Sequence, residues 1–248
     1  MAVRLPEGIT ACLFDLDGVL TRTAVLHAEA WKQAFDELLS RRAAHAAEPF
    51  VPFDDPKDYD AYVDGRARLD GTREFLESRG IELPEGDPAD PPESDTVQGV
   101  ANRKNALVLE LMESKGVDVY PGSVRFVEET RRCGLATAVV SASANTVHVL
   151  RAAGIDELFD ACVDGVVAHD EHLEGKPAPD TYLAAARRLG VPPGEAAVFE
   201  DALAGVESGR AGGFSFVVGV DRAGQRDALR GHGADVVVDD LAELLGPA

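Results

Sequence analysis

Two hydrophobic patterns divide the chain. From residue 119 onward, short apolar runs of strand length alternate with segments whose apolar residues recur every three or four positions, the spacing of an amphipathic helix. Residues 22–117 show helical spacing and long loops but no buried strand. Repeated strand–helix–strand units predict an α/β fold with a parallel sheet and right-handed crossovers.

One further apolar run, Ala11–Phe14, lies before the helical segment and predicts the first strand of the same sheet. The chain is therefore expected to form an α/β core from residues 1–21 and 118–248, with a mostly α-helical cap, residues 22–117, inserted after that strand. The other predicted strands are Leu135–Val140, a short strand near Cys162–Val167, Ala196–Phe199, Phe214–Val220 and Asp235–Val238.

The expected helices are placed by their apolar spacing and their end residues. Ser123 is a candidate N-cap for a helix that reaches Cys133, and Gly134 is a candidate terminator. The remaining core helices are expected at Asn145–Ala153, Thr181–Leu189, Ala204–Ala211 and near Arg226–Arg230, and the cap helices at Leu26–Leu39, Thr72–Arg79 and Val97–Gly116. Residues 40–65 and 84–95 are rich in proline and acidic side chains. This composition predicts a loop with short helices for residues 40–65 and a surface loop for residues 84–95.

The composition limits the possible partners and the cellular compartment of the chain. The chain of 248 residues has 24 basic and 44 acidic residues and a formal net charge of −20, which argues against nucleic acid as a partner. An anionic substrate would need a local basic pocket. No stretch approaches the apolar length of a membrane span, and the N-terminus lacks an apolar signal core. Three scattered cysteines favour a reduced, cytoplasmic compartment, and the absence of a leftover apolar stripe favours a monomer.

Asp15 and Asp17 follow the first predicted strand and are themselves followed by Gly18. In open α/β folds, ligands bind at the carboxyl ends of the strands. Two carboxylates there can hold Mg²⁺, or act as nucleophile and general acid/base. A simple turn is the alternative, since Asp and Gly are common turn residues.

Other predicted strands also end in polar residues. Ser141 and Ser143 follow one strand, Glu200 and Asp201 follow another, and Lys176 lies in the loop between. Each has an ordinary explanation alone: a turn serine, a surface lysine, or acidic residues at a helix start. Because parallel strands share one carboxyl edge, their joint occurrence favours a site for Mg²⁺-dependent phosphoryl transfer.

The chain resembles the haloacid dehalogenase superfamily in four motifs: Asp15-Leu-Asp17-Gly-Val, Val140-Ser-Ala-Ser143, Gly175-Lys-Pro-Ala-Pro-Asp180 and Glu200-Asp-Ala-Leu-Ala-Gly205. The second Asp of the first motif is typical of the phosphotransferase members and is absent from the dehalogenases. Within the superfamily the chain is similar to the β-phosphoglucomutase subgroup. The resemblance implies a Rossmann-like core with a helical cap.

It also implies a mechanism and a set of roles. Asp15 would form an aspartyl phosphate, and Asp17 would exchange protons with the sugar oxygens. Mg²⁺ would be held by Asp15, the Asp17 carbonyl and Asp201, with Glu200 close by. Ser141, the Ala142 N–H and Lys176 would hold the transferring phosphate. The implied substrate-binding residues are Thr23, His27, Trp31, Gly65, Arg68, Lys104, Ala142, Ser143 and Asn145.

Two departures from the subgroup's pattern leave the outcome open. Ala144 stands where the pattern has a lysine, and Arg22 stands where it has an aspartate. Arg22, Arg66 or Arg73 is a candidate replacement for the missing cation. The preferred interpretation is a β-phosphoglucomutase that converts β-glucose 1-phosphate into glucose 6-phosphate through glucose 1,6-bisphosphate. The alternatives are a sugar-phosphate phosphatase and, more remotely, a non-catalytic sugar-phosphate-binding module.

Overall fold

The computed structural model describes residues 2–246, and the chain divides into two compact units. The core comprises Met1–Arg22 and Val117–Ala248, and the cap comprises Thr23–Gly116. The internal boundaries between the two units lie one residue from those expected from the sequence.

The core is built on one six-stranded sheet with the order β3-β2-β1-β4-β5-β6. All neighbouring strands run parallel, so the predicted α/β fold is confirmed. The strands are β1 (Ala11–Phe14), β2 (Ala136–Val140), β3 (Ala161–Val163), β4 (Ala196–Glu200), β5 (Phe216–Val220) and β6 (Val236–Val238). Every residue of β1 and β4 is buried, as expected for parallel strands covered on both faces.

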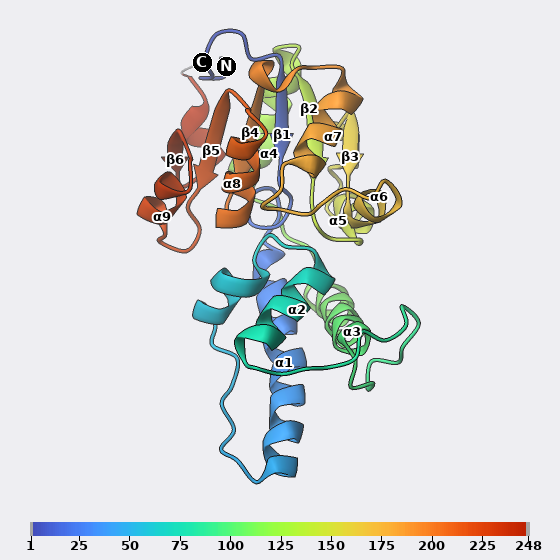
Figure 1. The fold of residues 1–248 in the computed structure, drawn as a ribbon. Coiled ribbons are helices and arrows are strands. Elements are labelled where there is room, and N and C mark those ends of the chain that lie inside the picture. Colours follow the sequence, from blue (N-terminus) through green and yellow to red (C-terminus); the bar gives the residue numbers. More distant parts are fainter. Residues whose placement is uncertain (1, 247–248) are drawn as a thin grey trace. The chain divides into compact units, whose positions relative to one another are not determined.

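Helices cover both faces of this sheet. In Figure 1, α7 and α8 lie in front of the strands and α4 lies behind them. The core helices are α4 (Pro121–Arg132), α5 (Thr146–Ala152), α6 (Gly165–Asp170), α7 (Asp180–Leu189), α8 (Leu203–Ala211) and α9 (Arg226–Gly231).

The strand order reverses at β1. The chain moves from β1 through β2 to β3, then crosses to β4 on the other side of β1. Such a reversal leaves a crevice at the carboxyl ends of the two strands beside it. The acidic motifs that follow β1 and β4 therefore meet at the position where an open parallel sheet binds ligands.

The cap packs its own hydrophobic core. It contains α1 (Ala24–Ala46), a short π-helix (Tyr59–Val63), α2 (Arg68–Ser78) and α3 (Val97–Lys115). The buried side chains of α1 recur every three or four residues from Leu26 to Leu39. Phe35 lies at the centre, with its ring centroid 5.0 Å from Trp31, 5.3 Å from Phe53 and 4.0 Å from Phe75.

Several predicted element bounds were wrong. The strand expected near Cys162–Val167 ends at Val163, because Asp164 caps α6 by accepting a hydrogen bond from the Val167 N–H at 2.9 Å. Ser123 does not cap α4. That helix begins at Pro121, whose fixed φ suits a first helical position.

The cap helices also differ from expectation. The first helix continues to Ala46, beyond the predicted end at Leu39. The second cap helix begins at Arg68, four residues before the predicted start at Thr72. Glycine lowers helix propensity, but Gly71 lies against Val63, where a Cβ would be crowded. Close packing therefore outweighs propensity at this position.

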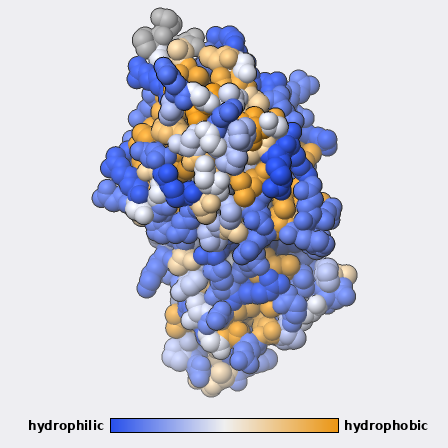
Figure 2. Space-filling view, turned by 45° about the horizontal axis from the view of Figure 1, so that its top comes forward, coloured by the Kyte–Doolittle hydropathy of each residue, from blue (hydrophilic) through white to orange (hydrophobic). Residues whose placement is uncertain are grey.

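Hydrophilic side chains dominate the face of the molecule shown in Figure 2, with smaller apolar patches among them. Within residues 2–246, none of the helices combines the length and apolar character needed to cross a membrane.

Candidate active site

Aromatic packing fixes the two acidic strand ends. Phe14 and Phe199 pair across β1 and β4, and their rings stack with centroids 4.6 Å apart. Asp15 and Glu200 come directly after these two residues. The Asp15 N–H donates to the Phe199 carbonyl at 2.9 Å, which continues the ladder beyond β1. The backbone of both acids is thereby held by the buried sheet.

Lys176 joins these two acids. Its Nζ lies 2.6 Å from Asp15 Oδ1 and 2.5 Å from Glu200 Oε1, and it donates to the Val140 carbonyl at 3.3 Å. The side chain is 2% exposed. Burial alone would lower the pKa of the ammonium, but Asp15 and Glu200 raise it by more, so the net pKa of Lys176 lies above its ordinary value. Lys176 therefore stays charged.

Glu200 is fully buried and is held by several donors. Besides Lys176, the Tyr182 hydroxyl donates to Oε1 at 2.9 Å and the Ala202 N–H donates to Oε2 at 3.2 Å. Gly205 lies so close that a Cβ there would overlap the carboxylate. Burial raises the pKa of Tyr182 well above its ordinary value, and the Glu200 charge acts in the same direction. Tyr182 therefore remains a neutral donor, a role that the sequence did not suggest.

Three carboxylates form a cradle for a cation. Oxygen atoms of Asp15, Glu200 and Asp201 all lie within 4.8 Å of one another. Burial raises the pKa of Asp15 well above its ordinary value; the charges of Glu200 and Asp17 also raise it, while Lys176 opposes them. The three clustered carboxylates supply the oxygen ligands that a hard divalent cation such as Mg²⁺ prefers.

The loop after β1 brings Asp17 to the same edge. Gly18 has φ of +86°, and a Cβ there would collide with the Asp201 carboxylate. Only glycine accepts both this backbone conformation and this close approach. The Ser141 hydroxyl, at the end of β2, lies 3.4 Å from Asp17 Oδ2. The structure thus places the predicted proton-transfer residue beside the second motif.

The second motif forms a tight loop of successive side-chain-to-backbone hydrogen bonds. The Ser143 N–H donates to Ser141 Oγ at 3.2 Å, and the Asn145 N–H donates to Ser143 Oγ at 3.1 Å. Ala142 lies between the two serines. These bonds hold Ser141, Ala142, Ser143 and Asn145 in one short turn after β2.

In the cap, three of the predicted substrate-binding residues lie together. Lys104 Nζ is 2.8 Å from His27 Nδ1 and 4.9 Å from the centroid of the Trp31 ring. Thr23 precedes α1 as its N-cap residue. Gly65, with φ of +69°, turns the chain between the π-helix and α2, and Arg68 begins α2. Burial lowers the pKa of Arg68, and its Nε is buried without a hydrogen-bond partner among the described residues.

The three candidate replacements for the cation missing at position 144 are each engaged elsewhere. The guanidinium carbon of Arg22 lies 4.4 Å from the centroid of the Tyr120 ring. Arg66 pairs with Glu74 at 2.5 Å, and Arg73 pairs with Asp70 at 2.8 Å and Glu85 at 2.5 Å.

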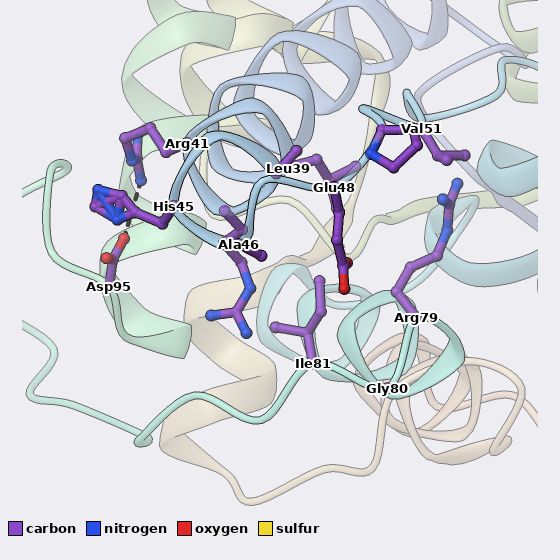
Figure 3. A pocket seen from close by; sticks show the side chains of 13 residues that line it. Leu39, Arg41, His45, Ala46, Glu48, Val51, Arg79, Gly80, Ile81 and Asp95 are labelled. Carbon is purple, nitrogen blue, oxygen red and sulfur yellow. Dashed lines mark hydrogen bonds and ion pairs between the residues drawn. The ribbon is translucent and has the colours of Figure 1, made fainter.

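A separate pocket of about 720 Å³ lies within the cap, between the C-terminal end of α1 and the end of α2. Figure 3 shows Arg41 and Asp95 paired on one side, Arg79 on the other, and Ile81 beneath. None of the predicted site residues lines this pocket. It is therefore distinct from the acidic edge of the sheet.

Comparisons with known proteins agree with this geometry. A family model described as haloacid dehalogenase-like hydrolase matches residues 9–213. The chain is 56% identical over 244 residues to a Mycobacterium bovis protein named β-phosphoglucomutase, covering 97% of this chain and 93% of that protein.

Two solved structures are similar over almost the whole chain. The crystal structure of a β-phosphoglucomutase from Clostridium difficile has a TM-score of 0.73 at 28% identity, covering 96% of this chain and 93% of that one. The structure of CbbY from Rhodobacter sphaeroides in complex with phosphate has a TM-score of 0.68 at 28% identity, covering 95% and 96%.

Proposed function

We propose that this chain, which belongs to the haloacid dehalogenase-like hydrolase family, is a Mg²⁺-dependent β-phosphoglucomutase. It would convert β-glucose 1-phosphate into glucose 6-phosphate through glucose 1,6-bisphosphate. The observation that carries phosphoryl transfer is the buried cluster in which Lys176 bridges Asp15 and Glu200 beside Asp201. The choice of sugar rests on the relative named β-phosphoglucomutase, at 56% identity over 97% of this chain.

Asp15 is the proposed nucleophile. Its carboxylate attacks phosphorus, the bond between phosphorus and the sugar oxygen breaks, and an aspartyl phosphate forms. Lys176 orients the carboxylate through Oδ1 and offsets negative charge on the phosphoryl group. Ser141 and the Ala142 N–H are the proposed donors to its oxygens. Mg²⁺, held by Asp15, the Asp17 carbonyl and Asp201, would neutralise the charge that accumulates during transfer.

Asp17 is the proposed general acid and base. It donates a proton to the sugar oxygen as that oxygen leaves phosphorus, then accepts a proton from the hydroxyl that attacks the aspartyl phosphate. The Ser141 hydroxyl beside its Oδ2 helps to orient the carboxylate. Glu200 keeps Lys176 in place. Because Lys176, Tyr182 and Ala202 already donate to its oxygens, Glu200 is proposed to lie close to the cation without being one of its direct ligands.

The cap residues are proposed to select the acceptor. Thr23, His27, Trp31, Gly65, Arg68 and Lys104 would bind the sugar, while Arg68, Ser143 and Asn145 would bind its second phosphate. If a sugar hydroxyl attacks the aspartyl phosphate, the result is isomerisation. If water attacks instead, the result is hydrolysis.

One assay distinguishes these functions. β-Glucose 1-phosphate is supplied with Mg²⁺ and a trace of glucose 1,6-bisphosphate, and glucose 6-phosphate and free phosphate are followed separately. We expect glucose 6-phosphate without stoichiometric phosphate from the wild type and neither product from Asp15→Asn. Phosphate as the sole product would show that the enzyme is a phosphatase and not a mutase. No turnover of this substrate would contradict the proposed sugar specificity.

The phosphatase remains the second candidate because of Ala144. Its methyl group supplies no charge to a second phosphate, and the three arginines suggested as replacements contact Tyr120, Glu74, Asp70 and Glu85. A non-catalytic binding module is disfavoured, since it would have no need of Asp15, Asp17, Lys176 and Asp201 together. We further propose a monomeric, cytoplasmic enzyme, and the three free cysteines fit a reducing compartment.

A further inference from the structure

The loop that follows β5 contacts both acidic segments of the site. The Arg222 Nε donates to the Gly18 carbonyl at 2.9 Å, and the Gln225 side chain donates to the Asp201 carbonyl at 3.0 Å. Gly18 directly follows the proposed acid/base Asp17, and Asp201 is a proposed cation ligand. A single loop thus holds the backbone beside both groups.

The loop has a defined conformation of its own. The Asp221 carboxylate accepts hydrogen bonds from the Gly224 N–H at 2.7 Å and the Gln225 N–H at 2.9 Å. This Asx-type turn fixes the direction in which the loop leaves β5. Arg222 and Gln225 are consequently presented by a structured turn next to the buried sheet.

Arg222 is held more firmly than a surface arginine. Its guanidinium carbon lies 3.6 Å from the centroid of the Tyr120 ring, and its Nη1 donates to the Asp239 carbonyl at 2.5 Å. The side chain is 18% exposed, and Nη2 is buried without a hydrogen-bond partner among the described residues. Burying an unpaired donor is unfavourable, so the contacts of Nε and Nη1 must stabilise this placement.

The spacing that these contacts control is tight. A Cβ at Gly18 would overlap the Asp201 carboxylate, so the Asp17–Gly18 segment and Asp201 are already in close contact. A small shift of either segment would change the position of the proton donor relative to the cation ligands. Displacements of about 1 Å at a reacting group can slow catalysis by about 10²-fold.

We propose that residues 221–225 are a positioning element for phosphoryl transfer, in which Arg222 holds the Asp17 segment and Gln225 holds Asp201. This inference rests on the proposed function of the same site. Neither residue belongs to the four motifs. Both act through the backbone of other residues and do not touch the reacting atoms.

The Arg222 arm of the test compares two leaving groups. Loss of leaving-group protonation slows transfer from a sugar phosphate but has little effect on an aryl phosphate, whose phenolate leaves without a proton. We expect Arg222→Met to slow single-turnover phosphoryl transfer from glucose 1,6-bisphosphate to Asp15 by about 10–100-fold and nitrophenolate release from p-nitrophenyl phosphate by less than about 3-fold. Arg222→Lys, which restores one charged donor, should recover part of the loss. Equal slowing of both substrates, or no slowing, overturns the role of Arg222.

The role of Gln225 can be tested by measuring Mg²⁺ binding, without measuring catalysis. Calorimetric titration of the substrate-free protein with Mg²⁺ should give an affinity about 10–100-fold weaker in Gln225→Leu, the usual effect of losing a group that orients a metal ligand. An unchanged affinity overturns the role of Gln225. The control is Arg210→Met, since Arg210 also donates to a backbone carbonyl, that of Gly233, but is an exposed side chain paired with Asp235. It should leave Mg²⁺ affinity and both transfer rates unchanged.

These readouts separate the inference from the proposed function. If the wild type fails to isomerise β-glucose 1-phosphate while Gln225→Leu weakens Mg²⁺ binding, the mutase proposal fails and the positioning role stands. If the wild type isomerises its substrate and the Arg222 and Gln225 variants match it in transfer rates and Mg²⁺ affinity, the mutase proposal stands and the positioning role fails.

Discussion

Removing the ammonium of Lys176 is the perturbation whose consequence the structure defines best. Lys176→Met keeps a long unbranched side chain but leaves Asp15 and Glu200 without their shared cation. Both carboxylates are almost completely buried, so water cannot readily replace the lost charge. The variant should therefore be destabilised even though the hydrophobic core is unchanged.

The magnitude follows from geometry and burial. With an effective dielectric constant of about 20, charges 2.5 and 2.6 Å apart attract by about 6 kcal/mol per pair, and desolvation offsets most of this. Breaking a buried pair by removing one partner costs about 3–5 kcal/mol. For a chain of this size, that loss corresponds to a fall in Tm of about 6–20 °C.

Urea denaturation in the absence of Mg²⁺ measures the loss. Circular dichroism reports on the whole chain, and the fluorescence of Trp31, the single tryptophan, reports on the cap. We expect the circular dichroism transition to move to lower urea and the fluorescence transition to move less. Adding Glu200→Gln to Lys176→Met should recover part of the stability, because it removes one of the two unpaired charges.

Lys115→Met is the matched control. Lys115 also lies 2.5 Å from a carboxylate, that of Glu29, but its side chain is 49% exposed. Exposed pairs contribute about 0–1 kcal/mol. If Lys176→Met and Lys115→Met reduce the free energy of unfolding by similar small amounts, the buried ion pairs of Lys176 do not contribute the expected stability.

Three further outcomes are expected. Hydrogen bonds from Arg103 lower the pKa of Glu37 below its ordinary value of 4.5, so the stabilisation by this ion pair is present above pH 4.5 and is lost as the pH falls through the lowered pKa. Glu37→Gln should therefore destabilise the cap by about 0.2–1 kcal/mol at pH 7. Urea denaturation at several pH values in which this difference does not shrink in acid would contradict the pairing. Phe35→Ala should cost about 3–5 kcal/mol in urea denaturation, and a loss below about 1 kcal/mol would contradict the central place of Phe35 among the cap aromatics. Gly18→Ala should weaken Mg²⁺ binding in calorimetry by at least about 10-fold, because its Cβ would displace the Asp201 carboxylate, and unchanged binding would refute that contact.

Much of the sheet could be predicted from the sequence because its strands are buried on both faces. Ala11–Phe14 is an uninterrupted apolar run that ends at Asp15, and the predicted strand bounds match β1. The strand that leads to Glu200 was predicted one residue short, since a fully buried glutamate in a strand requires donors that the local sequence does not reveal.

The supporting residues of the site could not be predicted, because they act over long sequence separations. Tyr182 lies on the buried side of α7, where an aromatic residue is explained by packing alone. Only the fold shows that its hydroxyl meets Glu200. Arg222 is 204 residues from Gly18, and an arginine in a loop is ordinarily a surface residue. The motifs therefore indicated the acids and the lysine but not the groups that hold them.

Trapping the phosphoryl group on the protein would identify the residue that attacks phosphorus. Glucose 1,6-bisphosphate carrying radioactive phosphorus is mixed with the Mg²⁺-loaded protein and quenched rapidly in acid, and a parallel sample is reduced with borohydride before peptide mass analysis. We expect acid-stable, base-labile label on the peptide that contains Asp15, reduction at that side chain, and no label in Asp15→Asn. Label on another residue, or turnover by Asp15→Asn at a rate near that of the wild type, would show that Asp15 is not the nucleophile.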